Sequence, residues 1–332
     1  MVPLLDLVEF VIGALVSLVC SWLLVSRLER VGARLGFSEA LLGVVAALAA
    51  DAPEITSAVT ALGHHQHEVG PGVVLGSNVF NLAALLGLGA VVAGRVLLHR
   101  RVVVLGGSVA LWVAAVAVLA VATPLAAAAA LALVLAVTVP YLVLLATRGR
   151  GAERFGLPRS WARWVGAAVA EEEQELYPAI HPPKAAPSDE IIAGLALVAV
   201  VLASVVMERA GSALGRRYDV PGIVLGALVL AAVTSLPNAV AAVYLAARGR
   251  GAAALSTALN SNTINIVAGL LVPAVVVGLG RPEGQTTLVA GWCGGLTALT
   301  LVLAFAGRGL RRRTGAVVIG GYLLFVAVLL VT

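Results

Sequence analysis

Charged residues are scarce in this sequence. They make up 12% of its 332 residues, against about 25% in soluble domains, while 61% of the residues are hydrophobic and the mean hydropathy is +1.03. Cysteine occurs only as Cys20 and Cys293, each within an apolar stretch, which excludes a cluster of cysteine ligands. No ATP-binding motif is present. These absences exclude a soluble domain and indicate an integral membrane protein.

Long runs with little or no charge recur along the whole chain. Each can cross a hydrocarbon core of about 30 Å as a helix of about 20 residues. They lie at residues 5–26, 38–62, 73–94, 102–123, 125–147, 191–207, 221–247, 252–280, 286–306 and 315–332. The sequence therefore predicts an all-α integral membrane protein with about ten transmembrane helices.

Arginines gather in every second connection between the predicted spans. Arg27, Arg30 and Arg34 follow the first span, whereas the connections at 63–72 and 208–219 have little net positive charge. Cytoplasmic loops carry an excess of Lys and Arg, so we expect a multi-pass cell-membrane protein with both termini outside. Because the basic residues are dispersed between spans, we expect no nucleic-acid partner.

The longest polar stretch, residues 148–189, separates a first unit at 1–147 from a second at 190–332, and the charge rule places this linker in the cytoplasm. Trp161 and Trp164 recur at helical spacing beside arginines, which is typical of a short helix at the membrane interface. We interpret the acidic run 171–175 and the histidines at 64, 65 and 67 as solvated polar segments. A regulatory cation or pH-sensing site is the alternative.

Two short motifs recur with one separation in the two units. Ala50-Asp-Ala-Pro-Glu54 corresponds to Thr234-Ser-Leu-Pro-Asn238, and Gly76-Ser-Asn-Val-Phe-Asn81 corresponds to Asn260-Ser-Asn-Thr-Ile-Asn265. The matching residues are 184 positions apart in both pairs. A repeated unit of about five spans must enter the membrane from the opposite side in its second copy, so we expect inverted-topology repeats with a substrate site near the midplane.

Polar residues surround the prolines of these motifs. Pro53 and Pro237 should break their helices and free backbone carbonyls within the membrane. Asp51 and Glu54, three residues apart, project from one helix face. Each carboxylate costs roughly 2.5–3.5 kcal/mol in the bilayer, and no Lys or Arg of a neighbouring span compensates it. Such oxygen ligands suit a hard cation, Ca²⁺ or Na⁺, although Ser and Asn also join helices by hydrogen bonds.

The predicted ligands come from both copies of the two motifs. They are Asp51, Glu54, Ser77, Asn78, Asn81, Thr234, Ser235, Asn238, Ser261, Asn262 and Asn265.

At these residues the chain resembles the cation/calcium exchanger superfamily, which includes the sodium/calcium exchangers. Members carry two inverted repeats with motifs similar to Gly-Thr-Ser-x-Pro-Glu and Gly-Ser-Asn-x-x-Asn. The resemblance implies that Glu54, Ser77, Asn81, Thr234, Ser235, Ser261 and Asn265 bind ions. The chain departs from the pattern at Asn238, where the second repeat normally has a glutamate, and at Ala50 and Asp51, where the first has hydroxyl residues. One carboxylate is lost and another gained, which leaves selectivity and stoichiometry open.

We therefore expect a secondary active cation antiporter that exchanges Ca²⁺ for Na⁺ by alternating access, with no cofactor and no catalytic residue. A proton-coupled exchanger, in which Asp51 or Glu54 carries the proton, is the alternative. An intramembrane hydrolase would need a catalytic pair, and the sequence has no His-Glu-x-x-His or Gly-x-Ser-x-Gly motif. A membrane scaffold without transport would tolerate the loss of Glu54.

The distribution of polar motifs also predicts which spans surround the site. Spans two, three, seven and eight carry them and should form the core, whereas the apolar spans one and six should slide against it. The expected partners are inorganic cations and the lipid bilayer, and homo-oligomerisation stays open.

Overall fold

The computed structural model describes residues 3–37, 39–147, 158–176, 186, 188–249, 251–280 and 284–332, which fold as a bundle of helices. The helices of the first half are α1 (Pro3–Arg34), α2 (Glu39–Ala50), α3 (Ala52–Gly63), α4 (Val69–Asn81), η1 (Leu82–Leu88), α5 (Gly89–Ala93), α6 (Arg100–Ala122) and α7 (Ala127–Ala146). Segments labelled η have π-helical geometry. The fold is all-helical apart from two short strands, as its composition predicts.

The remaining elements follow in the same way. They are α8 (Arg159–Leu176), α9 (Ser188–Arg217), α10 (Gly222–Val224), η3 (Leu225–Leu230), α11 (Ala231–Thr234), α12 (Leu236–Ala247), α13 (Gly251–Ile264), η4 (Asn265–Leu271), α14 (Val272–Val277), α15 (Gly284–Gly307) and α16 (Arg312–Val331). The strands are β1 (Arg95–Leu97) and β2 (Gly309–Arg311), which pair antiparallel.

Eight helices of the described residues are long and apolar enough to cross a membrane, or nine if α2 and α3, bent by 51°, count as one span. The apolar helix Gly222–Thr234 is shorter, and α12 continues it after a break at Ser235. With this second broken helix, five apolar segments precede α8 and five follow it, in agreement with the predicted duplication.

The two breaks are equivalent positions of the repeat. Asp51 lies between α2 and α3, and Ser235, 184 residues later, lies between α11 and α12. At both, the break residue donates its N–H four residues back, with N–O distances of 2.8 Å to Ala47 and 3.1 Å to Ala231. Proline follows two residues later and is tolerated there because it falls in the first turn of the new helix. Both helices are therefore broken at the proline motif, as the sequence predicts, while the depth of the breaks in the membrane stays a prediction.

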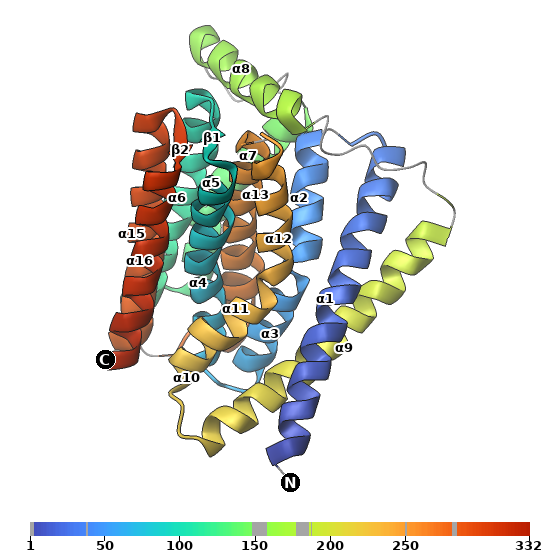
Figure 1. Ribbon diagram of the computed structural model, residues 1–332, viewed down its shortest axis with the longest axis vertical. Coiled ribbons are helices and arrows are strands. Elements are labelled where there is room, and N and C mark those ends of the chain that lie inside the picture. The colour runs from blue at the N-terminus through green and yellow to red at the C-terminus, as the bar shows by residue number, and fades with distance from the viewer. Residues whose placement is uncertain are drawn as a thin grey trace.

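The elements that carry the motifs lie together at the centre. α4 packs against α3, η3 and α11, and α3 packs against η4. α1 and α9 lie side by side along one edge, whereas α15 and α16 lie at the opposite edge (Figure 1). This arrangement agrees with the prediction of a four-span core and two peripheral spans.

Glycines allow the two halves to approach closely. A Cβ atom at Gly76 on α4 would lie 2.4 Å from the Cα atom of Ala227 on η3. One at Gly226 would lie 2.5 Å from the carbonyl oxygen of Val69. Because these neighbours are backbone atoms, no side chain fits there. The contact holds Ser77 and Asn78, which follow Gly76, against the second half.

The linker contributes one helix, α8, which crosses the end of the bundle opposite both termini (Figure 1). Val165 and Val169 on α8 are buried against the hydrophobic core, whereas Trp161 is exposed. The acidic run 171–175 lies within α8 and not in a loop, and Glu171 pairs with Arg101 at 2.7 Å. Linker residues 148–157, 177–185 and 187 lie outside the described residues, and the position of α8 at a membrane surface stays a prediction.

The structure differs from the sequence-based expectation in one loop and adds one feature that the sequence did not predict. The predicted loop 208–219 is helical as far as Arg217, so Glu208 is a buried residue of α9. Hydropathy marks where a bilayer ends, but a helix can continue into the aqueous layer beyond it. The β1–β2 pair is the second difference. It depends on contact between residues 95–97 and 309–311, far apart in the chain, which a local pattern does not reveal.

Candidate cation-binding site

The predicted ligands are all buried. Asp51 and Glu54 begin the second part of the broken first-half helix and have exposed fractions of 0%. Among the eleven predicted residues Asn262 has the largest exposed fraction, 5%. The set is therefore enclosed by protein and sits on four elements that the repeat brings together: the α2–α3 break, α4, the α11–α12 break, and α13 with the start of η4.

Both carboxylates are held by side chains of the other half. Asp51 Oδ1 accepts hydrogen bonds from Asn238 Nδ2 at 2.5 Å and from Ser261 Oγ at 2.6 Å. Glu54 Oε1 accepts one from Ser235 Oγ at 2.9 Å. Within the described part of the chain, neither carboxylate forms a salt bridge with Lys, Arg or His. Their negative charges are therefore solvated by neutral donors alone.

The asparagines of α4 and α13 bond to each other as the repeat symmetry requires. Asn78 Nδ2 donates to the Asn262 carbonyl at 3.0 Å, and Asn262 Nδ2 donates to the Asn78 carbonyl at 3.1 Å. This reciprocal pair lies where the two halves face each other. A pseudo-two-fold relation of the halves explains why each bond has its counterpart.

The outer asparagines follow the same symmetry. Asn81 Nδ2 donates to Ser261 Oγ at 3.1 Å and to Asn262 Oδ1 at 3.2 Å. Asn265 Nδ2 lies 3.4 Å from both Ser77 Oγ and Asn78 Oδ1. In each case the amide nitrogen faces the other half, which leaves the amide oxygen without a donor.

Five buried oxygen atoms of this region have no hydrogen-bond partner in the protein. They are Asp51 Oδ2, Glu54 Oε2, Ser57 Oγ, Asn81 Oδ1 and Asn265 Oδ1. Buried polar atoms without partners are rare because each loses its hydration without compensation. Two carboxylate, two amide and one hydroxyl oxygen form a ligand set that suits a hard cation. This chemistry makes the set a candidate site for a hard cation such as Ca²⁺ or Na⁺.

Two residues differ from the prediction in detail. Thr234 is buried, but its hydroxyl donates to the Leu230 carbonyl of the same helical segment at 2.9 Å, so it is engaged away from the carboxylates. Ser57 is absent from the predicted ligands although its oxygen is unpartnered. It lies three residues after Glu54, and this spacing on one helix face was the signal that could have identified it.

Nitrogen and sulfur ligands do not assemble elsewhere. Over the described residues, no group of three or more His, Cys, Asp or Glu side chains could hold a metal ion. The rings of His65 and His67 are 6.0 Å apart in the turn after α3. The oxygen set around Asp51 and Glu54 is therefore the better candidate for a cation site.

A membrane protein of two similar halves, with a buried oxygen site between them, has the architecture of a secondary cation transporter. The sequence matches the family described as sodium/calcium exchanger protein over residues 6–169 and 191–331, so this chain belongs to that family of cation antiporters. It is a transporter and not an enzyme, which excludes the hydrolase alternative.

Similar proteins agree with this assignment. The chain is 24% identical to the inner membrane protein YrbG of Escherichia coli (strain K12) over 234 residues, which cover 70% of this chain and 67% of YrbG. The structure of the sodium-calcium exchanger NCX_Mj soaked with 2.5 mM Na⁺ and 1 mM Sr²⁺ superposes with a TM-score of 0.64 at 20% sequence identity. The aligned region covers 98% of this chain and 99% of the exchanger chain.

A proton-coupled relative has a similar fold. The crystal structure of the H⁺/Ca²⁺ exchanger CAX superposes with a TM-score of 0.69 at 12% sequence identity. The aligned region covers 98% of this chain and 86% of the CAX chain. At these identities the likeness concerns the fold, and the fold is common to a sodium-coupled and a proton-coupled exchanger.

Proposed function

We propose that this protein exchanges Ca²⁺ for Na⁺ across the cell membrane by alternating access, with the ions bound between its two halves. The observation that carries the proposal is the set of five unpartnered buried oxygens, two of which belong to carboxylates that form no salt bridge among the described residues. A bound cation would supply the charge and the coordination that these atoms lack. The eleven predicted ligands are proposed as the site, with Ser57 added and Thr234 in a supporting position.

The charge of the site supports a divalent ion. Asp51 and Glu54 together carry two negative charges at neutral pH if both are ionised, which match one Ca²⁺ or two Na⁺. Ca²⁺ takes 6–8 oxygen ligands, and carboxylate, amide and hydroxyl oxygens are all present here. The absence of thiolate and imidazole ligands from the set disfavours transition metals.

Access to the site requires movement, because the unpartnered oxygens are shielded from solvent. α1 and α9 pack together and lie at one edge, beside the broken helix that carries Asp51 (Figure 1). Displacement of this pair would open a path to the carboxylates without breaking the asparagine contacts between α4 and α13. We infer that α1 and α9 move relative to a fixed core.

A proton-coupled exchange of Ca²⁺ is the second candidate. Each carboxylate has one oxygen held by hydrogen bonds and one without a partner, Asp51 Oδ2 and Glu54 Oε2. A proton placed on either free oxygen would neutralise that carboxylate when no metal is bound. The same two atoms can therefore alternate between Ca²⁺ and protons.

Calcium uptake into proteoliposomes distinguishes the two candidates. A Na⁺ gradient imposed at equal pH should drive uptake, whereas a pH gradient imposed without Na⁺ should not. The reverse result would establish proton coupling and contradict the choice of Na⁺. Uptake under neither gradient, with protein shown to be folded and inserted, would contradict calcium antiport altogether.

A further inference from the structure

We propose that Ser21 on α1 is a positioning residue that links the α1–α9 pair to the cation site, through the backbone carbonyl that Pro53 leaves without a donor. The link biases the protein toward the closed arrangement seen in the structure. This inference rests on the proposed alternating access, although its test does not depend on which ions are exchanged.

The first observation is a backbone carbonyl in need of a donor. In a continuous helix the N–H of residue 53 would bond to the carbonyl of residue 49, but proline has no N–H. Ser21 Oγ lies 3.2 Å from the Ala49 carbonyl oxygen and 3.3 Å from that of Ala50. Ser21 is fully buried. Because lipid offers no hydrogen bond, a side chain from α1 supplies what the broken helix lacks.

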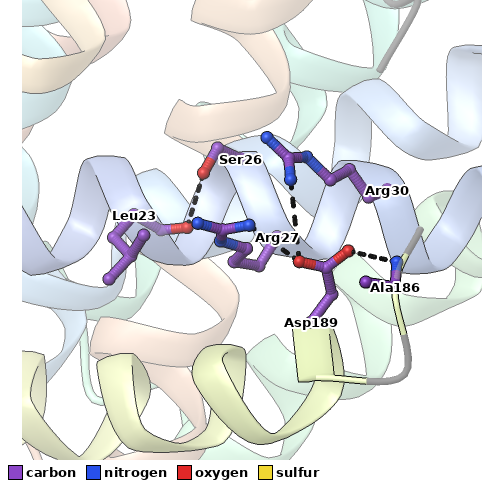
Figure 2. A network of polar contacts seen from close by, with 6 residues as sticks. All are labelled: Leu23, Ser26, Arg27, Arg30, Ala186 and Asp189. Carbon is purple, nitrogen blue, oxygen red and sulfur yellow. Dashed lines mark hydrogen bonds and ion pairs between the residues drawn. The ribbon is translucent and has the colours of Figure 1, made fainter. Parts of the chain in front are cut away.

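The second observation is that α1 and α9 are joined into one unit. Ser17 Oγ and Ser204 Oγ are 2.9 Å apart near the middle of the two helices. At the ends nearest the linker, Arg27 and Arg30 approach Asp189 Oδ1 at 2.8 Å and 3.7 Å, while the N–H of Ala186 donates to Asp189 Oδ2 (Figure 2). Arg34 pairs with Glu190 one turn further along α1. Movement of α1 would therefore carry α9 with it.

Among the described residues, the bond to a broken helix is made by α1, whereas α9 bonds to the core elsewhere, where Ser212 Oγ donates to Gln66 Oε1 at 2.8 Å. The position equivalent to Ser21 is Val205, 184 residues later, which has no hydroxyl. Pro237 likewise leaves the Val233 carbonyl without its helical donor, yet the nearby Ser204 of α9 faces Ser17 instead. The bond from Ser21 to the Ala49 carbonyl has no counterpart on α9 that could form when it breaks. It therefore stabilises the closed arrangement relative to the arrangement in which the α1–α9 pair has moved away.

The third observation is a cavity beside this contact. It has a volume of about 560 Å³, is lined mainly by apolar side chains of α1, α9 and the broken helix, and is open to the protein exterior where Leu48 and Leu197 are 50% and 46% exposed. The surfaces that meet here are therefore incompletely packed on the side of the break that leads toward the linker. When the pair withdraws, water can enter this space and reach the backbone of the site.

The experiment measures how often the α1–α9 pair withdraws. A cysteine at Ala193, which lines the cavity from α9 and is only 5% exposed, is introduced after Cys20 and Cys293 are replaced by alanine, and its reaction with a membrane-impermeant maleimide is followed in vesicles. Ser21→Ala should speed the labelling about fivefold, since one buried hydrogen bond holds the closed form. Ser21→Thr, which keeps the hydroxyl, should restore the slow rate. Ser17→Ala is the matched control and should leave the rate unchanged, because its bond lies within the moving pair.

A double-mutant cycle separates the proposed link from general loosening. Pro53→Ala gives the Ala49 carbonyl a main-chain donor, so Ser21→Ala should then change the labelling rate little. In the Pro237→Ala background the fivefold effect of Ser21→Ala should remain. The inference would be overturned if Ser21→Ala changed the labelling rate equally in the Pro53→Ala and Pro237→Ala backgrounds. It would also be overturned if, in the otherwise unchanged protein, Ser17→Ala sped the labelling as much as Ser21→Ala does. Calcium flux measured on the same vesicles tests the proposed function independently.

Discussion

At the scale of single residues, the two halves differ most at the positions that carry charge. Asp51 corresponds to Ser235 under the repeat, and Glu54 corresponds to Asn238, so both acids belong to the first half. Asn238 Nδ2 nevertheless lies 2.5 Å from Asp51 Oδ1. The carboxylate of Asp51 therefore occupies the region into which a glutamate at position 238 would project. The negative charge that a glutamate at position 238 would carry is therefore replaced by the charge of Asp51, which lies next to Asn238.

Loss of either carboxylate should impair calcium transport. Asp51→Asn and Glu54→Gln keep the size of the side chain but remove a charged ligand, and we expect the apparent affinity for Ca²⁺ to fall about tenfold to a hundredfold. Calcium uptake as a function of Ca²⁺ concentration measures this. Glu208→Gln is the control, because Glu208 is also fully buried but lies on α9 with its Oε1 bonded to Ser212. Wild-type affinity in either site variant would remove that carboxylate from the site.

Relocating the charge should preserve transport. Asp51→Ser alone removes one negative charge and a ligand oxygen, and should lower calcium uptake at a fixed, subsaturating Ca²⁺ concentration at least as much as Asp51→Asn does. The double variant Asp51→Ser with Asn238→Glu returns the second charge and places it where the resemblance to the exchanger family expects a glutamate. We expect at least about a tenth of wild-type uptake to return, since the hydrogen-bond donor Ser261 remains in place for the new carboxylate. A double variant no more active than Asp51→Ser would show that the carboxylate must lie on the first half.

The clustering of the candidate ligands was predictable from the sequence, whereas their individual contacts were not. Repetition and residue chemistry predict the clustering of Asp51, Glu54 and Asn81 because the repeat itself constrains where they lie. The orientation of Thr234 and the participation of Ser57 depend on how each side chain packs against the other half. A local pattern contains no information on that packing.

At the scale of elements, the site depends on the close contact between α4 and η3. A Cβ atom at Gly76 would lie 2.4 Å from backbone atoms of Ala227, which cannot move without shifting η3. Gly76→Ala should therefore destabilise the protein by about 1–3 kcal/mol or more, and should also lower calcium uptake by displacing Ser77. Thermal unfolding in detergent, followed with a thiol-independent probe, measures the first effect.

The matched control for this prediction is Gly291→Ala on α15. No atom lies within 4 Å of a Cβ added there, and alanine is the better helix former, so stability should be unchanged or slightly higher. Equal melting temperatures for the two variants would mean that the α4–η3 contact tolerates a methyl group.

Hydropathy and proline predict most elements because both act locally. Runs of about 20 apolar residues identify the spans, and Pro53 and Pro237 identify the breaks. The end of α9 was not predicted, because the backbone hydrogen bonds of the helix continue past Glu208 to Arg217, beyond the apolar run. The π-helical segments η1, η3 and η4 and the β1–β2 pair likewise arise from packing between distant parts of the chain.

At the scale of the whole molecule, the orientation in the membrane is a prediction with a direct test. Both termini lie at one end of the bundle and α8 at the other (Figure 1). Exposed positions Gly63 and Ser188 should therefore lie on opposite sides of the membrane, with Ser188 in the cytoplasm. Single cysteines at these positions, in a chain without Cys20 and Cys293, should react with an impermeant reagent from outside only at position 63. Labelling of both from one side would contradict the inverted topology.

The charge of the site also predicts how the whole transporter responds to voltage. Asp51 and Glu54 are the acidic residues of the proposed ligand set, and no basic side chain pairs with them in the described chain. The site with one Ca²⁺ or with two Na⁺ is then neutral. Moving one elementary charge through 100 mV takes about 2.3 kcal/mol, so a neutral loaded site crosses without this cost.

We therefore expect electroneutral exchange, with one Ca²⁺ crossing against two Na⁺. Calcium uptake into proteoliposomes should be insensitive to a membrane potential clamped with K⁺ and valinomycin, and Ca²⁺ jumps on a supported membrane should produce no steady current. Asn238→Glu adds a third negative charge next to Asp51, so the site with one Ca²⁺ would keep a charge of about −1 whereas three Na⁺ would neutralise it. This variant should become sensitive to voltage and produce a current. A current in the wild type, or none in a transporting Asn238→Glu variant, would show that charges outside Asp51 and Glu54 take part in the cycle.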